Sequence, residues 1–358
     1  MKIMNASYKA FFVLIITAAI LTAGCIQPET VETTDTPDGV SLPSEGTELQ
    51  SFQQTRSIMD TEITVKVFAS NESEGLRVIK EAFEEVEKVD SLMSPSKVES
   101  QLNLLNTEGM LEEADPAFLY VLERSLYYSE LSGGGFDITV KPVLDLWAEK
   151  FGPTGPRTPP TPEELNLTLE FVNYSKVRIE GRQVSLSPGM GIALGGIAKG
   201  YAVDKALESL QANEIENAFV NAGGDGKYIG NKLDAVGEKV PWVAGLQNPE
   251  KGEEFITRIN ARDVAVATSG NYERYFNESA RVSHISDPRT GYPSEELMSC
   301  TVIAPNAIDA DALATTAFVL GEEGGLELIE SLDSVECLFI TKDRRLVYSS
   351  GFQKYELV

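Results

Sequence analysis

Two early segments of the chain differ in the period of their hydrophobic positions, and each period predicts a different element. In residues 61–68 apolar and polar side chains alternate, which is the pattern of a half-buried strand. In residues 73–93 the apolar positions recur every three or four residues, which indicates an amphipathic helix. The helical positions are Leu76, Ile79, Phe83, Val86 and Val89.

Further elements follow from caps, helix breakers and apolar runs. Asp115 and Pro116 form a typical N-cap and first helical residue, and Gly133 marks the end of that helix. Residues 152–162 are rich in Pro and Gly and predict a loop. The other predicted elements are helices that start near Lys199 and Asp311, and strands at 176–186, 216–222, 241–247 and 255–268. Because strands and helices are interspersed without regular βαβ alternation, the predicted fold class is α+β.

The first 25 residues have the features of an export signal with a lipid attachment site. Lys2 and Lys9 give the N-terminal segment a positive charge. Residues 10–21 then form a run of 12 apolar or small side chains, too short to span a bilayer with ease. The Leu-Thr-Ala-Gly segment before Cys25 resembles the lipobox of exported lipoproteins, whose Cys is lipidated. An ordinary signal peptide with a chance Cys and a plain anchor helix are the alternatives. All three export the rest of the chain.

Residues 26–50 are rich in Pro, Thr, Glu, Asp, Ser and Gly and contain little apolar surface, which favours a flexible spacer. We therefore expect a signal peptide at 1–24, a lipidated Cys25 with a flexible linker at 25–50, and one folded domain at 51–358. The domain would be exported and held on the outer face of the cell membrane by the lipid.

Charge and rare residues narrow the possible functions. The formal net charge of −25 at pH 7 argues against binding to nucleic acid or to anionic lipid surfaces. His284 is the only histidine, which excludes a metal site built from several histidines. Cys300 and Cys337 lie in apolar runs, so we expect buried free thiols rather than a disulfide.

Residues 195–200 read Gly-Gly-Ile-Ala-Lys-Gly and join an apolar run, 191–194, interpreted as a strand, to a predicted helix. A glycine turn that opens a helix presents backbone N–H groups and the positive end of the helix dipole, which suits phosphate. Lys199 would add a mobile cation. A plain structural turn is the alternative. The Gly-Gly-Asp-Gly segment at 223–226 follows a predicted strand and is either a tight strand connection, the favoured interpretation, or a wall of a nucleotide pocket.

Asp311 and Thr315 are separated by four residues, so they would lie on one face of a helix. Both are hard oxygen ligands, and Mg²⁺ needs few protein ligands because water and phosphate complete its octahedron. The alternative is that Asp311 only caps the helix. Residues 284–291, His-Ile-Ser-Asp-Pro-Arg-Thr-Gly, combine the single imidazole with a carboxylate, a guanidinium and turn residues.

Six segments of the chain, in this order, resemble motifs of the FAD:protein FMN transferases, the ApbE family. They are residues 134–142, 194–204, 221–225, 267–270, 284–291 and 310–315. Residues 58–61 and 93–106 resemble the family's opening and Ser-rich segments, so the resemblance runs from about 52 to 350. It implies an ApbE-like, T-fold-like mixed sheet core with flanking helices and an FAD cleft between two intimate subdomains, with 51–358 as the catalytic domain.

The resemblance also implies a reaction. With Mg²⁺, such an enzyme binds FAD as substrate and moves the FMN half onto a Thr or Ser hydroxyl of another protein, releasing AMP. Metal ligands would be Asp311, Thr315 and a backbone carbonyl from Gly196. His284 would be the general base, assisted by Asp311, and Lys199 would lie near the pyrophosphate. Cofactor-binding positions would be Met59, Ser96, Gly135, Phe136, Asp137, Ala193, Lys199, Ile285 and Ala314.

The acceptors implied by the resemblance are flavoprotein subunits of Rnf-type or sodium-pumping quinone reductase complexes. Two other functions use the same residues: an FAD pyrophosphatase that gives FMN and AMP, and a non-enzymatic flavin-binding lipoprotein. The chain departs from the family at Ala193, where Asp is common, at Asp60, where Gly is usual, and around Ser96, where an aromatic residue is frequent. These differences bear on the affinity for FAD and on the contacts to its adenine half more than on the class of reaction.

Overall fold

The central feature of the fold is an eight-stranded sheet. The computed structural model describes residues 49–357 except 272–274, 278–281 and 284. Every pair of neighbouring strands is antiparallel, so the α+β class is confirmed, while the sheet that we expected to be mixed is not. In spatial order the strands are β1 (Gln50–Ile58), β2 (Thr61–Ala69), β6 (Ala218–Ala222), β7 (Asp225–Ile229), β12 (Val264–Gly270), β15 (Leu297–Ala304), β16 (Glu336–Thr341) and β17 (Leu346–Tyr348).

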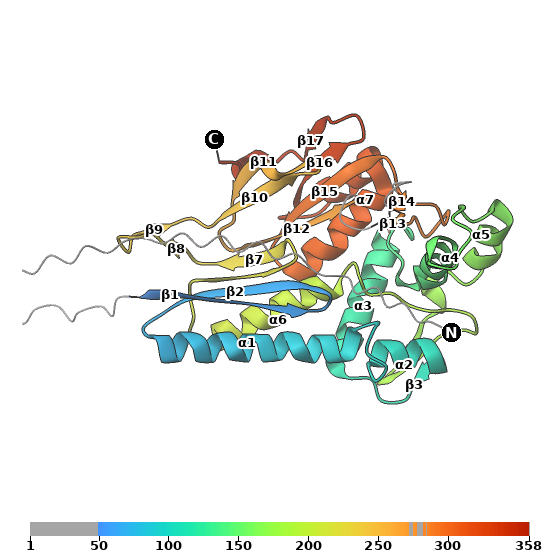
Figure 1. Ribbon diagram of the computed structural model, residues 1–358, viewed down its shortest axis with the longest axis horizontal. Helices are drawn as coiled ribbons and strands as arrows, with labels where there is room; N and C mark the ends of the chain where they lie inside the picture. Colours follow the sequence, from blue (N-terminus) through green and yellow to red (C-terminus); the bar gives the residue numbers. More distant parts are fainter. Residues whose placement is uncertain (1–48, 272–274, 278–281, 284, 358) are drawn as a thin grey trace, which may run out of the picture. The chain divides into compact units, whose positions relative to one another are not determined.

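Three long helices pack against this sheet, with α1 and α6 beside the β1–β2–β6 end and α7 beside β12 and β15 (Figure 1). The helices are α1 (Glu72–Met93), α2 (Gln101–Glu108), α3 (Pro116–Leu131), α4 (Lys141–Phe151), α5 (Pro162–Leu169), α6 (Ala198–Ala212) and α7 (Ala307–Glu330). No helix in the described part of the chain has the length and apolar character needed to cross a bilayer. By their contacts, the described residues form one compact unit.

Four smaller sheets accompany the main one among the described residues. They are β3 (Met110–Leu111) with β5 (Gln183–Ser185) and β4 (Arg178–Glu180), β8 (Lys232–Leu233) with β9 (Lys239–Val240), β10 (Val243–Asn248) with β11 (Lys251–Asn260), and β13 (Tyr275–Asn277) with β14 (Val282–Ser283). Three 3₁₀ helices complete the elements: η1 (Ile138–Val140), η2 (Tyr174–Lys176) and η3 (Phe352–Lys354).

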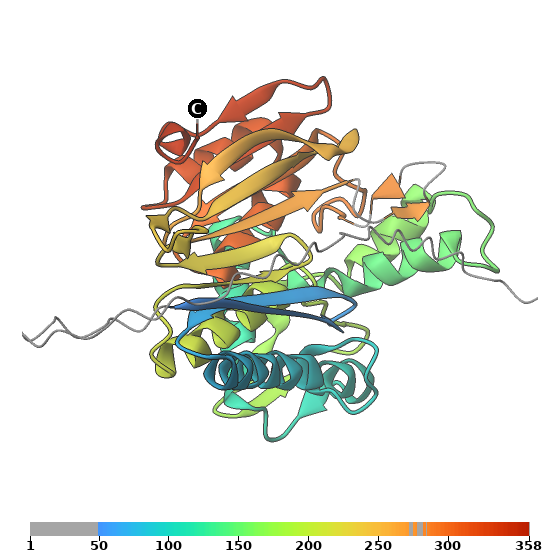
Figure 2. The same ribbon diagram turned by 60° about the vertical axis from the view of Figure 1, so that its left-hand side comes forward.

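The central strands of the main sheet are buried on both faces. Along β12, Ala265 and Ala267 point into the core under the helices, whereas Val264 and Val266 belong to a second core with Trp242. The β10–β11 pair contributes to this second core and covers part of the opposite face, as Figure 2 shows. Because successive side chains of a strand point to opposite faces, a central strand buried on both sides appears in the sequence as a continuous apolar run.

The predictions made from hydrophobic period are confirmed. The strand predicted at 61–68 is β2, and the helix predicted at 73–93 is α1. The Asp115 carboxylate caps α3 by accepting the N–H of Ala117 at 2.8 Å. Cys300 and Cys337 are buried free thiols, as expected, and lie on the neighbouring strands β15 and β16.

Three predicted elements were wrong. The strand predicted at 255–268 is two strands, β11 and β12, separated by a turn, and 176–186 contains the short pair β4 and β5. Residues 191–194 form no strand. Instead the Asn106 side chain pairs with both backbone groups of Ile192, at 2.9 and 2.7 Å, and Ala193 donates its N–H to the Ile138 carbonyl. These contacts satisfy the backbone without a neighbouring strand.

The helix that carries Asp311 begins earlier than predicted, at Ala307, because its N-terminus is capped by another helix. The Asp204 carboxylate of α6 accepts the N–H groups of Ala307 and Ile308 at 3.0 and 2.9 Å, and Lys227 donates to it at 2.8 Å. A carboxylate there pairs free N–H groups and favours the helix dipole. Asp311 is therefore not the cap of its helix.

Gly200 sets how closely α6 and α7 approach. A Cβ atom at this position would collide with the Ala307 carbonyl and lie 2.8 Å from the Cβ of Asp311. Neither contact is with the flexible end of a side chain, so a methyl group there would have to separate the helices.

We expect Gly200→Ala to lower the free energy of unfolding by about 3 kcal/mol or more, because overpacking against backbone is not relieved by a change of rotamer. Urea denaturation followed by circular dichroism measures this. Gly195→Ala is the matched control, since a Cβ atom there would meet no atom of the described residues within 4 Å. Equal stability of the two variants would contradict the proposed constraint.

Candidate active site

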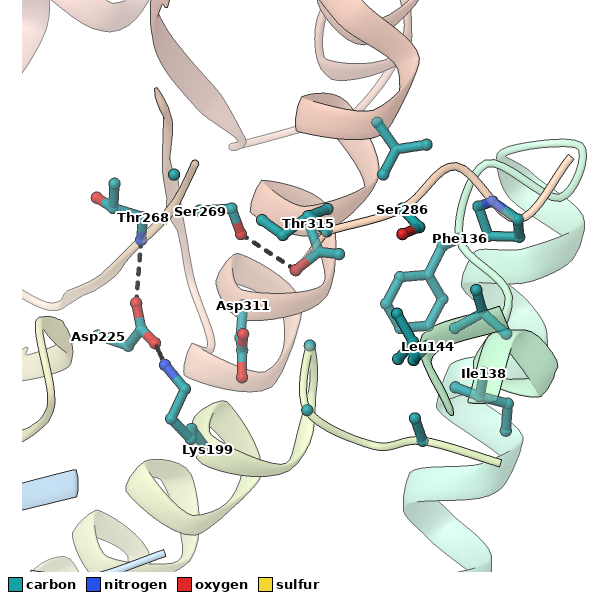
Figure 3. A pocket seen from close by; sticks show the side chains of 18 of the residues that line it. Phe136, Ile138, Leu144, Lys199, Asp225, Thr268, Ser269, Ser286, Asp311 and Thr315 are labelled. Atoms are coloured by element: carbon teal, nitrogen blue, oxygen red, sulfur yellow. Dashed lines mark hydrogen bonds and ion pairs between the residues drawn. The ribbon is translucent and has the colours of Figure 1, made fainter. Parts of the chain in front are cut away.

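A cavity of about 520 Å³ lies where α6, α7, the start of β7 and the end of β12 meet the segment around η1. Its volume is within the usual range for small-molecule and cofactor sites. Figure 3 shows charged and hydroxyl side chains at one end and apolar side chains at the other. We call these the polar end (Lys199, Asp225, Thr268, Ser269, Asp311, Thr315) and the apolar end (Phe136, Ile138, Leu144, Ser286).

An ion pair organises the polar end. The Lys199 ammonium, from the first turn of α6, pairs with the Asp225 carboxylate at the start of β7. The other oxygen of Asp225 accepts the backbone N–H of Thr268 at 3.0 Å. The Gly223–Gly224 turn, with φ values of +64° and +109°, joins β6 to β7 and leads directly into Asp225. The positive charge of Lys199 on α6 is thereby held at the cavity by β7 and β12, which are remote from it in sequence.

Asp311 is the most strongly perturbed acid of the cavity. Its carboxylate accepts the Gly200 N–H at 2.9 Å, and its side chain is buried. Burial raises the pKa of this carboxyl to about 7; the positive charge of Lys199 opposes the rise, Asp225 adds to it, and the hydrogen bond from Gly200 opposes it. An acid held in so unfavourable a place is typical of a site that binds a cation or handles protons.

Thr315 lies one turn after Asp311 on α7. The hydroxyls of Ser269 and Thr315 are 3.1 Å apart, and the backbone of Gly196 passes so close that a Cβ there would lie 2.8 Å from Thr315 Oγ1. A carboxylate, hydroxyls and a nearby backbone are the hard oxygen donors that Mg²⁺ prefers. No group of three or more His, Cys, Asp or Glu side chains suited to a metal occurs in the described part of the chain, so other oxygens would have to complete such a site.

Comparison with known proteins identifies the family. The ApbE family model matches residues 59–339. The chain belongs to the ApbE family. The FAD:protein FMN transferase of Treponema pallidum is 30% identical over 85% of this chain and 88% of its own, and that of Vibrio cholerae is 34% identical over 75% and 79%.

Solved ApbE structures have the same fold. The flavin transferase ApbE from Vibrio cholerae superposes with a TM-score of 0.74 at 30% identity, covering 86% of this chain and 99% of the other. The ApbE protein from Thermotoga maritima gives 0.77 at 30% identity, covering 86% and 100%.

The cavity brings together most of the residues to which the ApbE resemblance assigned roles. Those that line it are Gly135, Phe136, Asp137, Ala193, Gly196, Lys199, Ile285, Asp311 and Thr315. The carboxylate of Asp137 is engaged in hydrogen bonds within the protein, since it accepts the N–H groups of Thr139 and Tyr174 at 2.7 and 2.9 Å. Burial raises the pKa of this carboxyl.

Other predicted residues are placed elsewhere. Met59 belongs to the β1–β2 turn with a φ of +56°, Ser96 is exposed beyond α1, and Ala314 is buried in the core on α7; none of the three lines the cavity. The binding roles proposed for them stay predictions. His284 lies outside the described residues, and its neighbour Ile285 lines the cavity.

Three residues of the polar end lie in segments that resemble ApbE motifs but had no role assigned to them from the sequence. Asp225, Thr268 and Ser269 reach it because β7 and β12 pair, with Val266 opposite Gly226. The signal available in this ApbE sequence was the placement of Asp225 directly after two glycines, which was favoured as a structural turn. The turn is structural, and the carboxylate that follows it lines the cavity.

We expect Asp311→Asn to stabilise the cation-free protein more at pH 8 than at pH 5. The folded-state pKa, about 7, exceeds its ordinary value of 3.8, so the folded chain binds more protons between these values and loses stability as pH rises through them. Asn keeps an oxygen for the Gly200 N–H but carries no charge. The stability difference between variant and wild type should increase by about 2–3 kcal/mol from pH 5 to pH 8.

Chemical denaturation with a chelator present, at both pH values, measures this difference. A gain in stability that is the same at pH 5 and pH 8 would contradict the assignment of a buried, late-titrating carboxyl to Asp311.

Proposed function

We propose that this chain is an FAD:protein FMN transferase that moves the FMN half of FAD onto a Thr or Ser hydroxyl of another protein and releases AMP. One observation carries the proposal beyond family membership: a single cavity joins an apolar end to a polar end with a fixed cation and a buried carboxylate. FAD matches such a cavity, because it has flat aromatic ring systems and a negatively charged pyrophosphate in the linker between them. The names of the Treponema and Vibrio relatives support the same reaction.

The polar end fits a requirement for Mg²⁺. Asp311, Thr315 and a backbone carbonyl of Gly196 would hold the ion, which when bound stabilises the charge that develops on the transferred phosphoryl group. Lys199, fixed by Asp225, contributes a second positive charge beside the phosphates. The turn before α6 brings Gly196 close to Thr315 of α7, and α6 and α7 themselves contact each other.

His284 is the proposed general base for the incoming hydroxyl. A neutral imidazole accepts a proton at the pH of most cell exteriors. It directly precedes Ile285, which lines the cavity, and the turn that follows is rigid: the Arg289 N–H and guanidinium both donate to Asp287, at 2.8 and 2.9 Å.

We expect Asp311→Asn to lower FMN transfer by about 100-fold or more, because a neutral amide is a poor ligand for a divalent cation and supplies no charge. The measurement is covalent flavin fluorescence on an acceptor peptide with FAD and a Mg²⁺ titration. Asp309→Asn is the matched control: Asp309 is on the same helix but pairs with Arg124, outside the cavity. Its rate, per folded protein, should stay within about twofold.

Wild-type transfer rates in Asp311→Asn would overturn the metal role. The reaction itself is tested by its products. AMP release at the same rate with and without the acceptor peptide, and no flavin on the peptide, would show a pyrophosphatase instead, and FAD held intact with Mg²⁺ and acceptor would show a carrier.

The proposed acceptors are flavoprotein subunits of membrane redox complexes of the Rnf type or the sodium-pumping quinone reductase type. A lipid on Cys25 would confine the enzyme to the outer face of the cell membrane and raise its effective concentration near such subunits. The lipobox-like sequence and the Pro- and Thr-rich segment after it support this placement.

We expect Cys25→Ser to move the protein from the membrane fraction to the soluble fraction and to leave transfer to a soluble acceptor unchanged, since Cys25 is remote in sequence from the family match at 59–339. Fractionation with immunoblotting measures the first effect, and peptide labelling the second. A variant that still sediments with membranes would contradict the lipid anchor.

A further inference from the structure

One hydroxyl of the cavity has no internal partner. Ser286 Oγ is buried, only 5% of the residue is exposed, and the atom makes no hydrogen bond within the part of the chain that the structure describes. Ser286 nevertheless lines the cavity, at its apolar end near Phe136 (Figure 3). A buried polar atom without a partner is uncommon in folded proteins and destabilises the fold.

Ser286 differs in this respect from other hydroxyls of the cavity. Thr268 Oγ1 lies 2.8 Å from the hydroxyl of Thr301, and the hydroxyls of Ser269 and Thr315 lie 3.1 Å apart. Those groups at the polar end are satisfied before any ligand enters. The hydroxyl at the apolar end is not.

The loop that carries Ser286 is tied down on both sides, so the hydroxyl does not gain a partner by a small shift of the backbone. Ser294 donates its N–H to the Ile285 carbonyl at 3.0 Å, and Asp287 donates to the Tyr292 carbonyl at 2.8 Å. The indole N–H of Trp147, on α4, donates to the Gly291 carbonyl at 2.8 Å. The backbone of Ser286 itself forms an isolated antiparallel β-bridge with Pro293. The position of this hydroxyl at the cavity wall is therefore built into the fold.

We propose that Ser286 is a specificity-determining residue whose hydroxyl forms a hydrogen bond with a nitrogen or carbonyl oxygen at the edge of the planar ring that occupies the apolar end. The inference rests on the proposed function, which supplies FAD as the ligand. Phe136, Ile138 and Leu144 offer apolar surface that suits any flat ring. A buried hydroxyl that would otherwise stay unpaired discriminates against rings without a polar edge.

Both ring systems of FAD carry such edge atoms, the isoalloxazine and the adenine, and the shared chemistry is a planar heteroaromatic ring. Separate binding measurements with FMN, AMP and inorganic pyrophosphate distinguish them. The ring that Ser286 contacts is the one whose mononucleotide loses affinity when the hydroxyl is removed.

The test is Ser286→Ala with Ser294→Ala as the matched control. Among the described residues, Ser294 Oγ is also buried without a hydrogen-bond partner, on the same loop, but Ser294 does not line the cavity. Each variant loses one unpaired hydroxyl, so neither should unfold at a lower temperature than wild type in the absence of ligand. Only Ser286→Ala should bind FAD more weakly, by about 3- to 10-fold in Kd. Calorimetric titration with Mg²⁺ present measures the affinity.

The same titrations with the fragments complete the experiment. Weaker binding of FMN or of AMP, with pyrophosphate affinity unchanged, supports contact with the corresponding ring. An unchanged Kd for FAD in Ser286→Ala, an equal loss in Ser294→Ala, or an equal loss for pyrophosphate would overturn the proposal. If wild type labels the acceptor and Ser286→Ala keeps full FAD affinity, only this inference fails. If wild type does not bind FAD, the proposed function fails with it.

Discussion

The close contact between α6 and α7 is the constraint on which the rest of the site depends. Gly200 lets the first turn of α6 lie against the start of α7, and its N–H holds the Asp311 carboxylate. Asp204, one turn further along α6, caps α7 and so fixes where that helix begins. The same few residues therefore determine helix register, the position of Asp311 and Thr315, and the approach of the glycine turn to both.

The buried charges of the cavity lower the stability of the folded protein when no ligand is bound. Asp225 and Asp311 are buried within one cavity, and only part of their charge is compensated by Lys199 and backbone N–H groups. The negative charge of Asp225 adds to the raised pKa of Asp311, and the large apolar cores offset the cost of burying these charges. Such local conflict within an otherwise consistent structure is typical of a functional site.

Sequence patterns predicted what is set locally and missed what is set by tertiary contacts. The period of α1 and the caps of α3 are local, and the i, i+4 spacing correctly placed Asp311 and Thr315 on one helix. The start of α7 was misplaced because its cap comes from another helix. The run at 191–194 was mistaken for a strand because a buried segment satisfied by the Asn106 side chain is equally apolar. Asp225, Thr268 and Ser269 converge only through strand pairing, which no local pattern records.

The alanines between α7 and the sheet have a mechanical consequence. Ala265 and Ala267 of β12 face a helix whose own buried positions include Ala310, Ala314 and Ala317. Alanine has no side-chain torsion to adjust, so at these positions the helix and the sheet cannot change their separation by a change of rotamer. The wall that holds Asp311 and Thr315 is consequently stiff. The larger side chains of Phe136 and Leu144 at the apolar end have torsions that can adjust to a bound molecule.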